Sequence, residues 1–156
     1  MTARTFDAVT LVLGAASGPI LRLDEPLSFW GGLEPATGTI IDRLHPQRGA
    51  CVAGRILMMP TGRGSSSGSA TLAEALRLGN GPAAILMLER DAIVVVGAIL
   101  AAELYGLACP VALKRDLLWR NREGFPKRRE SDSTYWLLIG GQRGWGEPIL
   151  WTCGSG

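Results

Sequence analysis

The chain places a buried strand, a loop of glycine and serine, and a helix in direct succession, and this order constrains the fold most. Residues 50–59 are a strand candidate that ends at Pro60. Residues 67–78 carry apolar side chains at helical spacing, and Gly79 follows them as a C-terminal stop. The segment between them, residues 62–69, therefore joins the carboxyl end of a strand to the start of a helix.

The alternation of strands and helices continues after this unit. We predict strands at residues 84–88 and 109–113, and a helix at residues 98–105 that ends at Gly106. Strands that alternate with helices are typical of an α/β fold with parallel pairing in the sheet.

The first 46 residues predict strands of a different kind. Residues 9–12 and 20–23 are short and apolar, and a turn around Ser17-Gly18-Pro19 would join them as a hairpin. A hairpin in the same sheet makes the predicted sheet mixed. Residues 24–46 are rich in Pro, Gly and aromatic residues and form a long loop with a short strand at 39–41, and long structured loops are usually functional.

Composition limits the class of protein. A length of 156 residues, with 47% hydrophobic and 19% charged residues, fits one folded domain. We find neither an apolar run long enough to span a bilayer nor a signal sequence, and we expect a cytoplasmic protein that does not bind membranes. The three cysteines have no metal-ligand spacing, so we expect no metal on this chain.

The last third differs from the rest, and we divide the chain into a domain at residues 1–113 and an irregular tail at 114–156. The tail holds four of the five Trp residues, a basic cluster at residues 127–129 and one strand candidate at 135–139. Before Ala112 eight Arg face nine acidic residues, a net charge of −1, whereas after it eight basic face five acidic residues, a net charge of +3. The main body therefore gives no electrostatic case for nucleic acid.

The Gly/Ser loop, Gly-Arg-Gly-Ser-Ser-Ser-Gly-Ser at residues 62–69, predicts an anion site. Glycines allow φ > 0 and close approach of a ligand to the main chain. The helix that follows directs its unpaired N–H groups and the positive end of its dipole at the loop. Arg63 adds a fixed charge and the serines add hydroxyls, so a carboxylate or phosphate is the expected ligand.

Other interpretations of the loop stay open. The simplest is a serine N-cap after a Gly-rich turn. Residues 64–68 match the Gly-x-Ser-x-Gly motif of serine hydrolases, but the only histidine, His45, lies upstream of the serine instead of downstream. Gly62, Gly64 and Gly68 approximate a dinucleotide fingerprint with Glu89 as the ribose-binding acid, although a second mononucleotide half is missing.

Three ordered segments together resemble the small subunit or swivel domain of the aconitase X family. They are LDEPLSFWGG at residues 23–32, TGTIIDRLHP at 37–46 and the Gly/Ser loop. The family includes cis-3-hydroxy-L-proline dehydratases and phosphomevalonate dehydratases. The likeness covers about residues 11–111, and the tail departs from it.

The resemblance implies a swivelling β/β/α domain that closes over a larger catalytic subunit with an iron–sulfur or iron centre. It implies a hydro-lyase acting on a small anion, first cis-3-hydroxy-L-proline and next 5-phosphomevalonate. The family's base is a serine of this loop, which corresponds to Ser65. The loop residues expected to bind substrate are Arg63, Gly64, Ser66, Ser67, Gly68 and Ser69.

The aromatic segment Phe29, Trp30, Gly31 and Gly32 has two interpretations, a local hydrophobic cluster or a contact with the partner. Asp42 and His45 are placed at the mouth of the cleft, although a lone histidine is more often structural. A function of another class also remains, a stand-alone module that binds an anion or a dinucleotide without dehydratase activity.

Overall fold

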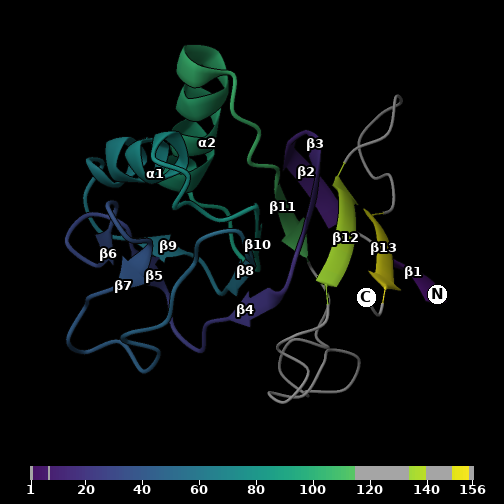
Figure 1. Cartoon of the computed structure of the whole chain (residues 1–156), viewed down its shortest axis with the longest axis horizontal. Helices are drawn as coiled ribbons and strands as arrows, with labels where there is room; N and C mark the ends of the chain where they lie inside the picture. The colour runs from purple at the N-terminus through teal and green to yellow at the C-terminus, as the bar shows by residue number, and fades with distance from the viewer. Residues whose placement is uncertain (1, 7, 115–133, 140–148, 155–156) are drawn as a thin grey trace.

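A computed structural model describes residues 2–6, 8–114, 134–139 and 149–154 of the chain, and the side chains of residues 8–114. The basic cluster at residues 127–129 lies outside them. The two helices, α1 (Gly68–Arg77) and α2 (Ala92–Tyr105), pack against each other on one side of the central sheet (Figure 1).

The central sheet has five strands and mixed direction, as predicted. Their order is β2 (Ala8–Val12), β11 (Val111–Lys114), β10 (Ala84–Met87), β8 (Ile56–Met59) and β4 (Ile20–Arg22). The last four strands run parallel, and β2 pairs antiparallel with β11 at one edge.

A second, antiparallel sheet lies beside the first and is seen at the right of Figure 1. Its order is β1 (Thr2–Phe6), β13 (Ile149–Gly154), β12 (Thr134–Ile139) and β3 (Gly14–Gly18). The strand predicted at residues 135–139 is therefore confirmed as β12, whereas β13 has no counterpart in the prediction. The boundary between residues 113 and 114 stays a prediction.

Both faces of the central sheet are buried, because the helices cover one face and β3 lies against the other, and side chains alternate between the two faces along each strand. One face packs on the helices: Leu57, Met59, Ile85 and Met87 join Leu72 and Val94 in the main core. The other face, with Ile56, Met58 and Leu86, packs on Ala16 of β3. This is why β8 and β10 are continuous apolar runs in the sequence.

The predicted hairpin of residues 9–12 and 20–23 is wrong. β2 and β4 lie at opposite edges of the central sheet, where β2 pairs with β11 and β4 with β8. The predicted turn residues Ser17 and Gly18 instead end β3, which pairs with β12. The physical reason is burial of apolar surface. At the two edges of the parallel core, the apolar side chains of β2 and β4 pack against that core, which pairing with each other would not provide.

Two other boundaries differ from the prediction. Helix α2 begins at Ala92, not residue 98, because the Asp91 carboxylate accepts hydrogen bonds from the N–H groups of Ile93 and Val94 and caps the helix there. Strand β8 begins at Ile56, because Gly54 turns the chain just before it with a φ of +66°. The predicted stop at Gly79 is confirmed by its φ of +76° after the helix.

Candidate active site

The Gly/Ser loop is held against the aromatic segment by two short parallel strands. β9 (Gly62–Arg63) pairs with β5 (Leu27–Ser28), with Ser28 opposite Arg63. Gly64 follows with a φ of +96°, and a Cβ at this position would meet the Ser28 hydroxyl. Glycine is therefore required at residue 64 both for conformation and for space.

Ser65 begins the turn that leads into α1, whose N-cap residue is Ser67. The Ser65 carbonyl accepts from the Gly68 N–H at 2.9 Å, and its Oγ accepts from the Ser67 N–H at 3.2 Å. The first turn is tight, since the Ser66 carbonyl accepts from the Ser69 N–H three residues later, at 3.1 Å. The hydroxyl of Ser65 therefore receives a main-chain N–H at the positive end of α1 and keeps its own proton for another partner.

Burial divides the predicted site residues into two groups. Arg63 through Ser67 are exposed, while Gly68 and Ser69 are buried. The Ser69 hydroxyl donates to the Ile93 carbonyl of α2 at 2.8 Å, and a Cβ on Gly68 would meet Ile93 Cγ2 at 3.1 Å. Gly68 and Ser69 therefore join the two helices, and only residues 63–67 face outward.

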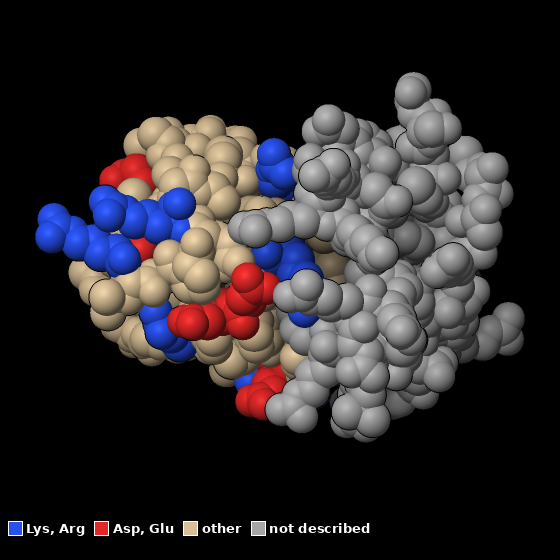
Figure 2. Space-filling model, turned by 90° about the horizontal axis from the view of Figure 1, so that it is seen from below, with Lys and Arg blue, Asp and Glu red and all other residues tan. Residues whose placement is uncertain are grey.

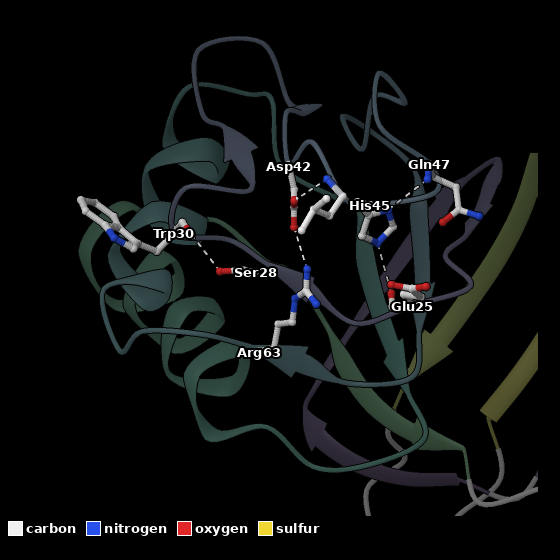
Figure 3. A network of polar contacts seen from close by, with 8 residues as sticks. Glu25, Ser28, Trp30, Asp42, His45, Gln47 and Arg63 are labelled. Carbon is white, nitrogen blue, oxygen red and sulfur yellow. Dashed lines mark hydrogen bonds and ion pairs between the residues drawn. The ribbon is translucent and has the colours of Figure 1, made fainter.

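Arg63 does not stand alone at the mouth of the loop. Its Nη2 lies 2.7 Å from Asp42 Oδ2, although the two residues are 21 positions apart (Figure 3). The other carboxylate oxygen of Asp42 accepts the Leu44 N–H at 3.0 Å. The Leu44 N–H first and the Arg63 guanidinium second hold the pKa of Asp42 below its ordinary value of 3.8, so Asp42 is ionised at neutral pH.

Comparison with known proteins identifies the family. The family model for the aconitase X swivel domain matches residues 5–120. The chain belongs to the aconitase X swivel-domain family. It is 50% identical over 103 residues to a cis-3-hydroxy-L-proline dehydratase of Pseudomonas aeruginosa, which covers 66% of this chain but only 18% of that protein.

Two further relatives agree. A phosphomevalonate dehydratase small subunit of Methanothermobacter thermautotrophicus is 40% identical over 95 residues, 61% of this chain and 72% of its own length. The solved holo-form of Thermococcus kodakaraensis aconitase X has a TM-score of 0.69 at 26% identity and covers 87% of this chain and 91% of its own. The mixed α/β fold is thus that of an aconitase X swivel domain.

The aromatic segment of this aconitase X swivel domain splits between core and surface. Phe29 is 1% exposed and belongs to the core, which agrees with the interpretation of the segment as a local hydrophobic cluster. Trp30 is 60% exposed and points away from the polar network, with its carbonyl accepting from the Ser28 hydroxyl at 2.8 Å (Figure 3). Gly31 is exposed, whereas Gly32 is buried against the main chain of Ser28.

His45 has a structural position. It is 3% exposed, its Nδ1 accepts from the Gln47 N–H at 3.1 Å, and its Nε2 lies 3.3 Å from the Glu25 carbonyl (Figure 3). With Nδ1 as the acceptor, Nε2 carries the ring hydrogen and donates a hydrogen bond to the main-chain carbonyl of Glu25. Both ring nitrogens of His45 thus have partners within this aconitase X swivel domain, in agreement with the structural interpretation of a lone histidine, whereas Asp42 reaches Arg63.

Two residues beside the loop have no place in the sequence prediction. Ser28 lies against Gly64, and Asp91 lies 2.5 Å from where a Cβ on Gly62 would be. Asp91 sits just before an apolar run and could have been found as an N-cap. Ser28 lies within the segment 23–32 that carries the family resemblance, but no local pattern places it beside the loop, because only the pairing of β5 with β9 brings it there.

Charges and possible metal ligands complete the description of the site. In the view of Figure 2, blue and red side chains are interspersed over the described residues of this face. Among the described residues of this aconitase X swivel domain there is no group of three or more His, Cys, Asp or Glu side chains that could hold a metal ion. Nor does either of its described helices have the length and apolar character needed to cross a membrane.

Proposed function

We propose that this chain is the small, swivelling part of an aconitase X type dehydratase and supplies Ser65 as the catalytic base. The observation that carries the proposal is the position of the Ser65 hydroxyl. It is exposed, accepts the Ser67 N–H at 3.2 Å and lies in the turn just before α1. The family relationship supports the same reaction class, because the curated relatives are named as dehydratases.

A serine hydroxyl is a weak base, so its alkoxide needs stabilisation before it can take a proton from carbon. The N–H of Ser67, the dipole of α1 and the charge of Arg63 supply it, in a site closed to water when the partner covers the loop. In the reaction the C–H bond breaks and its proton passes to Ser65 Oγ. The electron pair of that bond forms a carbon–carbon double bond as the hydroxyl on the neighbouring carbon leaves with the electron pair of its C–O bond. Release of the proton from Ser65 Oγ then completes the water molecule and regenerates the alkoxide.

The rest of the active site belongs to a larger subunit in this proposal. The chain matches only 18% of the length of the hydroxyproline dehydratases, so the remaining 82% has to be supplied by another domain or chain. The iron–sulfur or iron centre would lie there and assist departure of the hydroxyl. Arg63, Gly64, Ser66 and Ser67 would bind the anionic group of the substrate, and Trp30 would contact the partner.

For the substrate we propose cis-3-hydroxy-L-proline first and 5-phosphomevalonate second. The order follows the identities, 50% to the Pseudomonas hydroxyproline dehydratase and 40% to the Methanothermobacter phosphomevalonate dehydratase small subunit. Both substrates carry the anionic group that the loop is suited to hold.

The test is Ser65→Ala in the enzyme reconstituted with the large subunit. We expect kcat to fall about 10²- to 10⁴-fold while substrate binding is kept. Because the Ser65 hydroxyl also accepts the Ser67 N–H in the turn before α1, Ser65→Asn is the matched control: asparagine retains a side-chain acceptor for that N–H but is not a base. Both variants should be equally inactive, and only Ser65→Ala should lose the hydrogen bond to the Ser67 N–H and with it about 1 kcal/mol of stability.

Near-normal turnover of Ser65→Asn would refute the assignment of the base. Co-purification of the tagged chain with a larger iron protein tests the shared active site. A stable monomer that binds inorganic phosphate but never a larger subunit would instead support the stand-alone anion-binding module, and binding of NAD(P) would support the dinucleotide alternative.

A further inference from the structure

Asp42 is held in place by contacts that do not involve Arg63. Its main-chain N–H donates to the Gly32 carbonyl at 3.3 Å, and its Oδ1 accepts the Leu44 N–H at 3.0 Å. The Asp42 side chain is 19% exposed, against 44% for Arg63. The carboxylate is therefore the ordered member of the pair, and the long arginine side chain takes its direction from it.

The contact leaves most of the guanidinium free. One nitrogen of Arg63, Nη2, donates to one oxygen of Asp42 at 2.7 Å. Arginine has five N–H donors in a rigid fork, so several of them remain for a carboxylate or phosphate. Without the Asp42 carboxylate, the half-exposed Arg63 side chain would sample many rotamers. The conformational entropy lost when an anion orders that side chain would then weaken the binding of the anion.

We propose that Asp42 is a positioning residue, which holds the Arg63 guanidinium at the mouth of the Gly/Ser loop for the anionic group of the substrate. The inference rests on the proposed function and adds to it the residue that sets the anion-binding geometry. Asp42 does not touch substrate. It acts through Arg63, whose neighbour two positions along the chain is Ser65.

The direction in which KM changes when the Asp42 carboxylate is removed separates this role from simple charge balance. A carboxylate beside Arg63 cancels part of its attraction for an anion. If charge balance were its only effect, removal of the carboxylate would improve binding and lower KM. If Asp42 orients Arg63, its removal weakens binding and raises KM, in spite of the more positive charge.

The experiment uses Asp42→Asn in the reconstituted enzyme with cis-3-hydroxy-L-proline. Asparagine keeps an oxygen for the Leu44 N–H, so the local turn is retained while the charge is lost. We expect KM to rise about fivefold or more with a smaller change in kcat. Asp42→Glu, which restores the carboxylate, should recover part of the loss, and Asp42→Asn should add nothing in an Arg63→Gln background.

Glu74→Gln is the matched control. It breaks the other described ion pair, Glu74 with Arg77, which has the same 2.7 Å separation and an arginine of similar exposure, 46% against 44%, but lies at the far end of α1. KM should be unchanged in this variant. An unchanged or lower KM for Asp42→Asn, or effects that add fully to those of Arg63→Gln, would overturn the inference.

A measurement on the full chain alone separates this inference from the proposed function. The Arg63 Nε–Hε resonance in NMR should report an ordered side chain in the wild type and an averaged one in Asp42→Asn. If that change is absent, Asp42 does not position Arg63, whatever the enzyme does. If it is present and Ser65→Asn remains active, the positioning stands and the proposed base is wrong.

Discussion

The hydroxyl of Ser69 donates a hydrogen bond to the carbonyl of Ile93, 24 residues along the chain, at 2.8 Å. This bond ties the first turn of α1 to the first turn of α2. The two helices follow the neighbouring parallel strands β8 and β10, so the bond fixes both helix starts at one edge of the sheet. The Gly/Ser loop is held in place from this buried end.

Ser69→Ala is expected to destabilise the fold. The side chain is 8% exposed, and loss of its hydrogen bond should lower the free energy of unfolding by about 1 kcal/mol. Urea denaturation followed by circular dichroism measures it. Ser66→Ala is the control, because Ser66 is exposed in the same loop and its removal should change stability by less than about 0.5 kcal/mol. Equal losses of stability in the two variants would contradict the division of the loop into exposed residues 63–67 and the buried Gly68 and Ser69.

Gly64→Ala should destabilise the fold more than Gly31→Ala does. Both glycines have positive φ, +96° and +74°, so alanine is strained at either position, by about 1–2 kcal/mol. Only at Gly64 would the new Cβ also meet Ser28, whereas at Gly31 nothing lies within 4 Å. Thermal unfolding of the two variants isolates the steric part, and a larger loss for Gly31→Ala would show that the Ser28 contact is absent.

The carboxyl of Asp42 should titrate below its ordinary pKa of 3.8. Since the pKa is lower in the folded chain than in the unfolded one, the stabilisation it gives is present above pH 3.8 and is lost as the pH falls through the lowered pKa. NMR of the side-chain carboxyl measures it directly. Arg63→Gln should raise the pKa only in part, because the Leu44 N–H is the larger cause, and full recovery to 3.8 would contradict that order.

Cysteine labelling should distinguish Cys51 from Cys109. Cys51 is exposed, whereas Cys109 is 1% exposed, and burial raises its pKa to about 12. At pH 8 the thiolate of Cys109 is therefore scarce as well as covered. Iodoacetamide followed by peptide mapping should show alkylation of Cys51 in the native chain and of Cys109 only after unfolding. Rapid native labelling of Cys109 would contradict its place in the core.

The local patterns of the sequence predicted much of the fold. The apolar run of β10, the helical spacing of α1 and the stop at Gly79 depend on residues close together in the chain, and all three are confirmed. The start of α2 was missed because its first turn, with three successive valines at residues 94–96, also suits a strand. There the side chain of Asp91 decided the helix start.

The sequence by itself determined the Gly/Ser loop, its place between a buried strand and a helix, and the family of the chain, because these depend on the order of residues. Tertiary structure decided which strands pair, which loop residues are buried and which carboxylate meets Arg63. Those outcomes depend on contacts between distant segments: β4 covers the edge of β8, Ser69 reaches α2, and Asp42 lies 21 positions from its arginine. Spacing along the chain does not encode such distances, because long loops close at little extra entropic cost and the packed core selects the partner.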